Sequence, residues 1–257
     1  MVANNNVKEI LIGHLRELHL PTFRECFEDA AGRAQQETLS YEQYLLELAE
    51  RECEVRRGNR IDRLLRQSKL PLEKDLDCFN MKRLPAKVSR QVRTLLDGGF
   101  VDRSENLLAF GKSGSGKTHL LAGIAQELIR NGRKVYFSTC SLLVQELLIA
   151  KRDLKLSRLL NRLAGFDALM IDDIGYVQQS REEMEVLFTL LAERYERGTV
   201  MLTSNLAFSK WEAIFKDPMT TAAAIDRLVH HSVILELNIP SFRLEEAKQA
   251  KAKEKDE

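Results

Sequence analysis

The fold is decided by the stretch NLLAFGKSGSGKT, residues 106–118. Its apolar start predicts a buried strand at 106–110, and its second half fits the pattern G-x-x-x-x-G-K-[ST], with a helix expected from about Lys117. Glycines let the backbone of such a loop curl so that successive N–H groups point inward at phosphate oxygens, and the helix N-terminus adds a favourable dipole. Strand, loop and helix together predict a loop that holds the phosphates of ATP.

The residues of this loop have different expected roles toward a nucleotide. The Lys117 ammonium is expected to reach the β- and γ-phosphates, and the Thr118 hydroxyl is expected to ligate Mg²⁺. The candidate cofactor-binding residues, for ATP with Mg²⁺, are Gly111, Lys112, Ser113, Gly114, Ser115, Gly116, Lys117, Thr118 and His119.

A second apolar run, 168–171, delivers two carboxylates, Asp172 and Asp173. Alone, a run that ends in Asp-Asp is common and favours a turn after a strand. Beside a phosphate-binding loop it has the pattern of a Walker B element, in which Asp172 holds Mg²⁺ through water and Asp173 orients and activates the attacking water. The metal ligands that we expect are therefore Thr118 and Asp172.

Short apolar runs alternate with helical segments after about residue 105. Continuous runs of this length, each separated by a helix, predict a parallel sheet covered on both faces, which is a three-layer α/β domain. The expected strands are 106–110, 134–138, 167–171, 199–203 and 233–237.

Residues 1–70 have the pattern of a small all-helical module. Apolar residues recur near helical spacing between 10 and 18, until Pro21 interrupts the pattern. Thr22 is expected to cap a second helix that continues through the following phenylalanines, because a threonine hydroxyl can accept a bond from an N–H group of the first turn.

A third helix is expected to start after Ser40. Ser40 followed by Gln43 is a capping-box pattern, in which each side chain bonds the backbone N–H of the other residue. The helix is expected to end at Arg57 or, past a glycine, to continue to Leu70. Pro71 terminates it in either case.

The formal net charge of +1 hides an uneven distribution. Residues 1–55 carry 5 basic and 11 acidic side chains, whereas residues 56–93 carry 12 basic and 4 acidic ones. Such a basic block indicates a polyanion-binding surface or, alternatively, a solvated helix face. On a helical wheel its arginines fall opposite Ile61, Leu64 and Leu65, which can pack inward. The candidate DNA-binding residues are Arg56, Arg57, Arg60, Arg63, Arg66 and Lys69.

Composition excludes several classes of protein. No run of 18 or more apolar residues occurs, which argues against a transmembrane span. The opening residues MVANNNVKEI lack the apolar region of a secretory signal, so none is expected. The four cysteines are scattered with no C-x-x-C pair, which favours reduced thiols in a cytoplasmic protein over disulfides or a zinc site. The length of 257 residues suits one full domain and a smaller one.

The order of these motifs resembles the AAA+ clade that contains the DnaC helicase loaders and the IstB-like transposition helpers. The IstB-like resemblance is the closer and extends over most of the chain. The stretches that carry it are 106–108 leading into 116–120, 171–176, 202–206 with Trp211, and 226–231, together with 18–21 and 39–42. These partial motifs are more specific to the family than the phosphate-binding loop itself.

The resemblance implies further catalytic residues. Asn205, where Ser-Asn could simply initiate a turn, would contact the γ-phosphate or the water as sensor 1. Arg227 would enter the nucleotide site of a neighbouring subunit and stabilise transition-state charge, or would form an ion pair within its own surface. Arg243 would act in cis as sensor 2. The adjacent His230 and His231 have no partner at metal-binding spacing and are expected to be ordinary helix-end residues. The candidate catalytic residues are Asp173, Asn205, Arg227 and Arg243.

The resemblance also implies a function. Such helpers bind double-stranded DNA, assemble on it into ATP-bridged oligomers, and assist a cognate transposase in target selection, in the cytoplasm and nucleoid of bacteria. We expect slow ATP hydrolysis that DNA or the transposase stimulates, because Asp173 stands where many AAA+ proteins have the longer glutamate. The family often has Pro-Pro where this loop has Lys112-Ser113.

The domains expected from the sequence and the resemblance follow the change in pattern near residue 75. They are a helical DNA- or partner-binding module at 1–75, an AAA+ ATPase domain with a reduced or absent lid at 76–245, and a charged, disordered tail at 246–257.

Three alternatives stay open. A DnaC-type helicase loader would bind single-stranded DNA and a hexameric helicase. A small-molecule phosphotransferase would leave the basic block unexplained. A purely structural DNA-coating protein would never turn ATP over. A transposase reading frame next to the gene would favour the transposition helper.

Overall fold

The computed structural model describes residues 2–175, 180–211 and 218–242. Close backbone contacts divide the chain into two compact units, residues 1–63 and 64–257. The expected domain limits at residues 75 and 245 are a proposal, and the expected charged tail at 246–257 lies outside the described residues. None of the helices in the described ranges is long and apolar enough to span a membrane.

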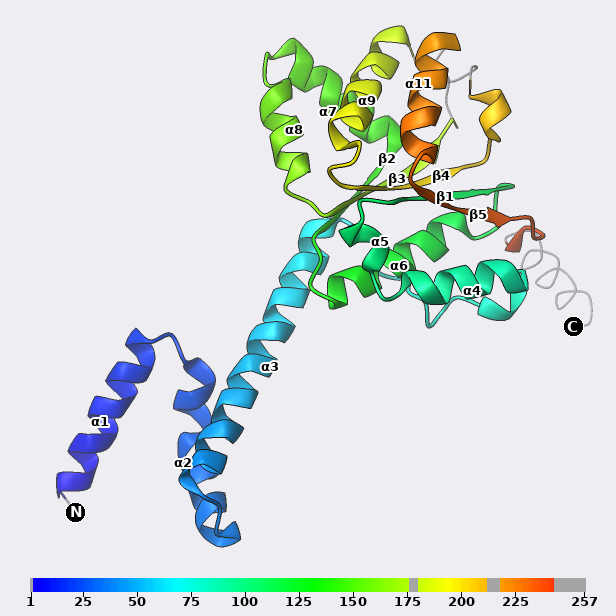
Figure 1. Ribbon diagram of the computed structural model, residues 1–257. Coiled ribbons are helices and arrows are strands. Elements are labelled where there is room, and N and C mark those ends of the chain that lie inside the picture. The colour runs from blue at the N-terminus through cyan, green and yellow to red at the C-terminus, as the bar shows by residue number, and fades with distance from the viewer. Residues whose placement is uncertain (1, 176–179, 212–217, 243–257) are drawn as a thin grey trace, which may run out of the picture. The chain divides into compact units, whose positions relative to one another are not determined.

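The second unit is built on a five-stranded parallel sheet with the strand order β2-β3-β4-β1-β5 (Figure 1). Its strands are β1 (Asn106–Gly111), β2 (Val135–Thr139), β3 (Ala168–Ile174), β4 (Thr199–Ser204) and β5 (Ser232–Leu237). The five strands expected from the apolar runs are therefore confirmed, with ends that differ by at most three residues. Because β4 lies between β3 and β1, the polar residues that follow these three strands meet at one edge of the sheet.

Helices cover both faces of the sheet, as the sequence predicts (Figure 1). One face carries α4 (Ala86–Leu95), α5 (Gly99–Asp102) and α6 (Lys117–Arg130), and the other carries α7 (Cys140–Arg152), α8 (Leu156–Ala164), α9 (Arg181–Arg194) and α11 (Pro218–Val229). Two short 3₁₀ turns, Met81–Arg83 and Phe208–Lys210, complete the unit. Every residue of β4 is buried, which explains its continuous apolar pattern.

The larger core lies under the helices α7, α8, α9 and α11. Its fully buried members include Leu147, Leu163, Leu187 and Leu202, and each such side chain contributes about 1.5–3 kcal/mol through burial. Trp211 is also fully buried, and its indole N–H donates to the Leu206 carbonyl at 3.3 Å. This core holds the sheet edge that carries the polar residues of the site.

Arg194, at the end of α9, is a buried charge that closes the opposite edge of the sheet. Its guanidinium donates to the carbonyls of Phe166, Asp167 and Thr199 at 2.8–3.0 Å, next to the first residues of β3 and β4. Burial lowers the pKa of Arg194 to about 10, and the nearby Asp167 carboxylate opposes that shift. The carbonyl bonds offset part of the cost of burying the charge.

The first unit is made of α1 (Val2–Glu17), α2 (Pro21–Glu37) and the start of α3 (Tyr41–Ser68), which ends in the second unit. The capping box at the start of α3 is confirmed: the Ser40 N–H donates to Gln43 Oε1 at 2.9 Å, and the Gln43 N–H donates to Ser40 Oγ at 3.3 Å. Of the two expected ends of this helix, Arg57 and Leu70, the structure agrees with the later one, because α3 continues past the glycine to Ser68.

The start of α2 differs from the sequence expectation that Thr22 caps it. The helix begins at Pro21, so Thr22 lies inside its first turn and is buried. Glu52 of α3 is the actual cap, because its Oε2 accepts the Thr22 N–H at 2.9 Å and the Phe23 N–H at 3.4 Å. Arg56 completes the arrangement by donating to Glu52 Oε1 at 2.8 Å. A tertiary contact thus replaces the local cap that the sequence suggests.

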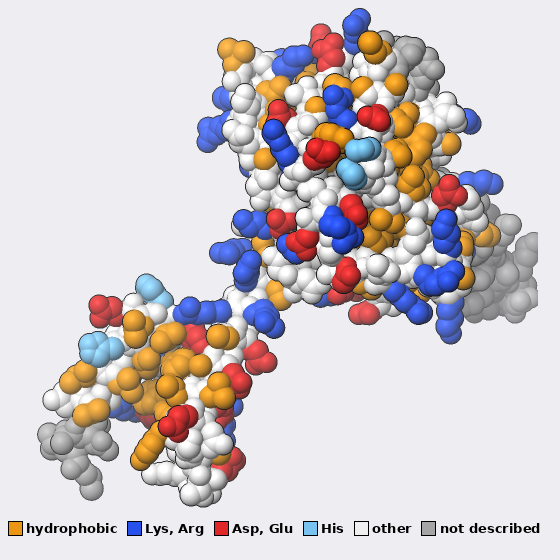
Figure 2. Space-filling model, in the orientation of Figure 1, with side chains coloured by type: hydrophobic (Ala, Val, Ile, Leu, Met, Phe, Trp, Pro, Cys, Tyr) orange, Lys and Arg blue, Asp and Glu red, His pale blue; other side chains and the backbone are white. Residues whose placement is uncertain are grey.

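The first unit exposes many apolar side chains (Figure 2). They are Val7, Ile10, Leu11, Leu18, Tyr41, Leu45, Leu46 and Val55. A contiguous apolar surface on a small unit is typical of a site that another protein covers. It is consistent with the partner-binding role expected of this region.

We predict that Glu52→Gln weakens the N-terminus of α2, because the amide is uncharged and pairs poorly with Arg56 and the two backbone N–H groups. The free energy of local opening should fall by about 1–3 kcal/mol. Hydrogen exchange of the α2 amides in the full chain measures it. The matched control is Glu54→Gln, at an exposed position on the same helix; equal exchange in the two variants would contradict the capping role.

The same carboxylate makes α2 sensitive to acid. Burial raises the pKa of Glu52, but the bonds from Arg56, Thr22 and Phe23 outweigh it and hold that pKa below its ordinary value of 4.5. This stabilisation is present above the unfolded-state pKa and is lost as pH falls through the lower folded-state pKa. Protection of the α2 amides should therefore decline below about pH 4.5 in the wild type and should change less with pH in Glu52→Gln.

Candidate phosphate-binding site

The glycine-rich loop 111–116 joins β1 to α6 at the polar edge of the sheet. Gly114 and Gly116 adopt left-handed conformations, with φ of 77° and 86°. A Cβ at Gly114 would meet the Ser241 side chain, and one at Gly116 would lie 3.0 Å from a ring carbon of Phe79. Both positions therefore require glycine, so that the loop keeps the inward curl that a phosphate needs.

Two side chains of the loop suit an anion. Lys117 is only 5% exposed, and its Nζ donates to the carbonyls of Gly111 and Lys112 at 2.9 and 3.0 Å. A buried ammonium held by the loop's own carbonyls can exchange them for phosphate oxygens. The Ser115 hydroxyl is buried and has no hydrogen-bond partner among the described residues. These features fit a bound phosphate group.

Asp172 of β3 is the centre of a hydrogen-bond chain. It is 6% exposed, and its Oδ1 accepts the hydroxyls of Thr118 at 2.8 Å and of Thr203 at 2.6 Å. The Thr203 hydroxyl in turn accepts the backbone N–H of Asp173 at 2.8 Å. The two expected metal ligands therefore lie together, and their oxygen atoms are of the kind that Mg²⁺ prefers.

Asp173 occupies a special backbone position. The strand expected from the sequence ends at residue 171, before the two aspartates. Instead β3 continues to Ile174, through an irregularity in its pairing with β4 between Ile171 and Ile174. Asp173 lies in this irregularity with φ of 59° and is exposed. Bulges of this kind re-aim one side chain without ending the strand. Asp173 thus projects into the site while Asp172 stays buried.

A cavity of about 410 Å³ lies at this edge of the sheet. It is lined by Lys74, Ser113, Gly114, Gly116, Lys117, Thr118, His119, Asp173, Asn205 and Phe242. Six of the nine candidates from the loop region therefore line the cavity together with Asp173 and Asn205, whereas Gly111, Lys112 and Ser115 are not among its lining residues. Lys74 and Phe242 were not identified from the sequence, where Lys74 stood only as one charge of the basic block.

The segment 71–79 is packed along α6, beside the cavity. Gln126 of α6 donates to the carbonyls of Pro71, Leu72 and Lys74 at 3.2–3.4 Å. His119 lies 2.7 Å from the Asp75 carbonyl through its Nε2. The Cys78 N–H donates to the Asp75 carboxylate at 2.8 Å and lowers the pKa of that group, with smaller contributions from His119 and Arg130.

Aromatic rings border the cavity at two places. The Phe79 ring meets the His119 ring edge to face, with centroids 5.2 Å apart. The Phe242 backbone N–H donates to the Gly114 carbonyl at 2.9 Å, and the guanidinium of Arg83 lies over the Phe242 ring at 5.1 Å. Arg243, which was expected to act as sensor 2, lies outside the described residues.

Arg227 is not among the residues that line this cavity. It is half-buried on α11, where its guanidinium is 4.5 Å from the centre of the Phe188 ring of α9 and its Nη1 donates to the Ala223 carbonyl at 3.5 Å. Among the described residues Arg227 forms no ion pair within its own surface, and its expected role in a neighbouring subunit stays a prediction.

The candidate DNA-binding residues have different surroundings. Arg56 pairs with Glu52 and also donates to the His19 carbonyl. Lys69 donates to the Tyr136 hydroxyl at 3.3 Å and lies 5.1 Å from the centre of that ring. The exposed members along α3 are Arg56, Arg57, Arg60, Arg63 and Arg66. Substitution of Arg56 or Lys69 would therefore remove contacts within the protein as well as a possible DNA contact, and a DNA-binding test must distinguish the two effects.

Comparison with known proteins identifies relatives along nearly the whole chain. A sequence model of the family described as IstB-like ATP binding protein matches residues 13–250. An insertion sequence ATP-binding protein of Sinorhizobium fredii is 38% identical over 251 residues, which cover 97% of this chain and 84% of that protein. The ATP-binding protein of insertion sequence IS5376 from Geobacillus stearothermophilus is 37% identical over 251 residues, which cover 98% and 100%.

Solved structures confirm the AAA+ fold. The DnaC helicase loader matches with a TM-score of 0.56 at 16% identity, over 65% of this chain and 97% of that one. A DNA replication initiation factor matches with a TM-score of 0.57 at 18% identity, over 72% of this chain and 56% of that one. Because the identities are this low, the similarity concerns the fold alone.

We predict that Thr203→Val destabilises the second unit by about 1–3 kcal/mol, because it leaves the Asp173 N–H and the buried Asp172 carboxylate without their shared partner. Thr199→Val is the matched control. Both threonines are fully buried on β4, but the Thr199 hydroxyl has no hydrogen-bond partner within the described part of the chain, so its loss should be neutral or stabilising. Denaturant unfolding of the full chain measures both, and equal effects would contradict the role of Thr203.

Proposed function

The chain belongs to the IstB-like ATP-binding family of P-loop AAA+ proteins, and from that premise we propose an ATPase that assembles on double-stranded DNA and assists a transposase in target selection and transposition. The observation that carries the ATPase is the convergence of Lys117, Thr118 and the Asp172 hydrogen-bond chain on one cavity. The names of the relatives, which belong to insertion sequences, support the link with transposition.

In this proposal the loop holds the phosphates and the strand ends hold the metal. The backbone N–H groups of 113–118 and the Lys117 ammonium bind the phosphate oxygens. Mg²⁺, when bound, neutralises charge on the β- and γ-phosphates. Thr118 and Asp172 hold it through oxygen, and Thr203 keeps the Asp172 carboxylate oriented.

The attacking water is positioned by two residues of the cavity. Asp173 accepts a proton from the water, and Asn205 at the end of β4 orients it. Because an aspartate reaches less far than a glutamate, hydrolysis by the isolated protein is slow. Contact with DNA or with the transposase then raises the rate.

Arg227 acts on the nucleotide of a neighbouring copy. Its position on α11, apart from the cavity lining of its own chain, supports this assignment. A guanidinium brought against the γ-phosphate stabilises negative charge in the transition state. ATP therefore promotes assembly between copies, and hydrolysis releases it. Arg243 acts in cis on the same phosphate.

DNA is bound by the exposed basic side chains of α3. They neutralise backbone phosphates, which gives affinity with little sequence preference. The alternative is a DnaC-type helicase loader, which would bind single-stranded DNA and a replicative helicase. Preference for duplex over single strands, and stimulation by the transposase rather than by a helicase, distinguish the two.

We predict that Lys117→Ala and Asp173→Asn separate nucleotide binding from hydrolysis. Lys117→Ala should lose at least about 30-fold in ATP affinity, because a buried charge that meets the phosphates is removed. Asp173→Asn should retain ATP but hydrolyse it about 10²–10⁴-fold more slowly. Equilibrium binding of a fluorescent ATP analogue and phosphate release measure the two steps. Normal turnover by Asp173→Asn would show that another residue activates the attacking water.

We also predict that Arg60→Gln combined with Arg63→Gln weakens duplex binding equally on unrelated sequences. The slope of log K against log salt concentration should fall by about 2, because two phosphate contacts are lost. Arg51→Gln is the control, on the same helix but paired with Glu47 at 3.1 Å. Arg56 is left intact because of its bond to Glu52. An unchanged slope would make this face a solvated surface only.

A further inference from the structure

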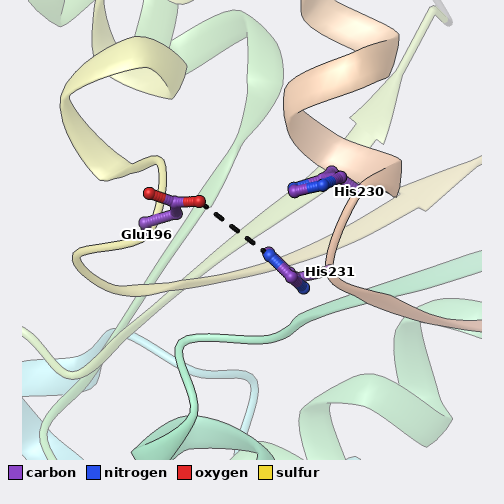
Figure 3. Close-up of side chains that lie close together, drawn as sticks. All are labelled: Glu196, His230 and His231. Atoms are coloured by element: carbon purple, nitrogen blue, oxygen red, sulfur yellow. Dashed lines mark ion pairs between the residues drawn. The ribbon is translucent and has the colours of Figure 1, made fainter.

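Three side chains with metal-binding atoms converge on the surface of the second unit (Figure 3). Glu196 follows α9, whereas His230 and His231 lie between α11 and β5. One ligand atom from each lies within 4.8 Å of the other two, and His231 Nε2 is 3.9 Å from Glu196 Oε1. The two histidines, which lack a partner at metal-binding spacing in the sequence, obtain one from a distant turn.

The backbone fixes the three positions. Glu196 has φ of 58°, a left-handed conformation that is unfavourable for a glutamate and turns the chain after α9. The carbonyl of His231 accepts the Asn106 N–H of β1 at 2.7 Å, and the His230 N–H donates to the Asp226 carbonyl at 2.9 Å. The side chains are exposed, but the backbone of the two histidines is bonded to β1 and to the last turn of α11.

Tyr195 orients one of the imidazoles. Its hydroxyl lies 2.9 Å from His230 Nδ1. When the hydroxyl oxygen accepts a hydrogen bond from Nδ1–H, the lone pair of Nε2 is left for a metal ion. Such a second hydrogen bond is the usual companion of a metal-binding histidine.

We propose that Glu196, His230 and His231 form a binding site for a divalent transition metal of the zinc class. Two neutral imidazoles and one carboxylate suit Zn²⁺ rather than Mg²⁺, which prefers oxygen ligands. Ligand bonds of about 2.0–2.2 Å require the three atoms to approach by roughly an ångström, which exposed side chains achieve by rotation. Water completes the coordination.

The bound ion joins the turn after α9 to the end of α11, the helix that carries Arg227. Glu196 belongs to the turn after α9, and the histidines follow α11, which carries Arg227 over Phe188 of α9. Cross-linking these ends fixes α11 against α9. The site is independent of the proposed ATPase, because no ligand is a residue of the cavity.

Zinc titration of the untagged full chain tests the proposal. The protein is stripped with a chelator, exchanged into buffer with excess Mg²⁺ to occupy the nucleotide site, and titrated with ZnCl₂ against a chromophoric zinc indicator. Cys26, Cys53 and Cys78 are replaced by serine throughout, because accessible thiols bind zinc themselves. We expect one Zn²⁺ per chain and a higher melting temperature with the metal.

Variants locate the ion. Glu196→Gln, His230→Gln and His231→Gln should each weaken zinc binding at least tenfold and abolish the thermal shift. Tyr195→Phe should weaken it about tenfold without changing the melting temperature of the metal-free protein. His14→Gln, at an exposed histidine beside Glu17 in the first unit, should change neither quantity. Absence of saturable binding, or equal binding by the three ligand variants and the wild type, would overturn the proposal.

Discussion

The rest of the site depends on one carboxylate oxygen, Asp172 Oδ1, which accepts hydrogen bonds from two threonine hydroxyls. Thr118 lies in the first turn of α6, Asp172 belongs to β3 and Thr203 to β4, so this oxygen joins the end of the phosphate loop to two strands. Thr203 extends the chain to the Asp173 backbone and so holds the exposed carboxylate in its irregular position. A buried carboxylate without these partners would cost several kcal/mol, and the loop would lose its alignment with the strand ends.

The segment before the sheet is the second constraint on the loop. The segment 71–79 can pack closely against α6 because the helix has a glycine where the segment crosses it. A Cβ on Gly123 would lie 2.7 Å from Leu76, just as one on Gly116 would press on Phe79. The two N–H bonds of the Gln126 amide are then shared among three carbonyls of a segment that has no strand or helix of its own. The segment 71–79, which borders the cavity on one side, therefore depends on Gly116 of the loop and Gly123 of α6.

The first unit follows a different principle. Its three helices have few buried apolar residues, chiefly Leu15, Ala30 and Leu48, and its surface is rich in apolar side chains. The buried Glu52 carboxylate is therefore important for the packing of these helices, because this residue of α3 caps the N-terminus of α2. Arg56, the first residue of the basic block, neutralises that carboxylate. Charge in this region thus serves both the fold and the proposed contact with DNA.

Much of this architecture could be predicted from the sequence, because it is encoded locally. The loop 111–118, the five apolar runs and the Ser40 capping box each depend on residues within a few positions of one another. The alternation of strands and helices then implied a parallel sheet, and parallel strands bring their carboxyl ends to one edge. Asp173 is predicted from an apolar run beside the phosphate-binding loop, whereas the role of Asn205 comes from the family resemblance, and both residues line the cavity.

The distant side chains that complete these local elements are determined by the packing of the folded chain. Glu52 replaces Thr22 as the cap of α2, Thr203 connects the two aspartates, and Glu196 joins the pair of histidines. Lys74 and Phe242 enter the cavity in the same way. A hydrogen bond or a ligand contact forms wherever the fold brings complementary atoms within about 3 Å. Periodicity and short motifs specify a strand, a helix or a loop, but they carry no information about that distance between segments.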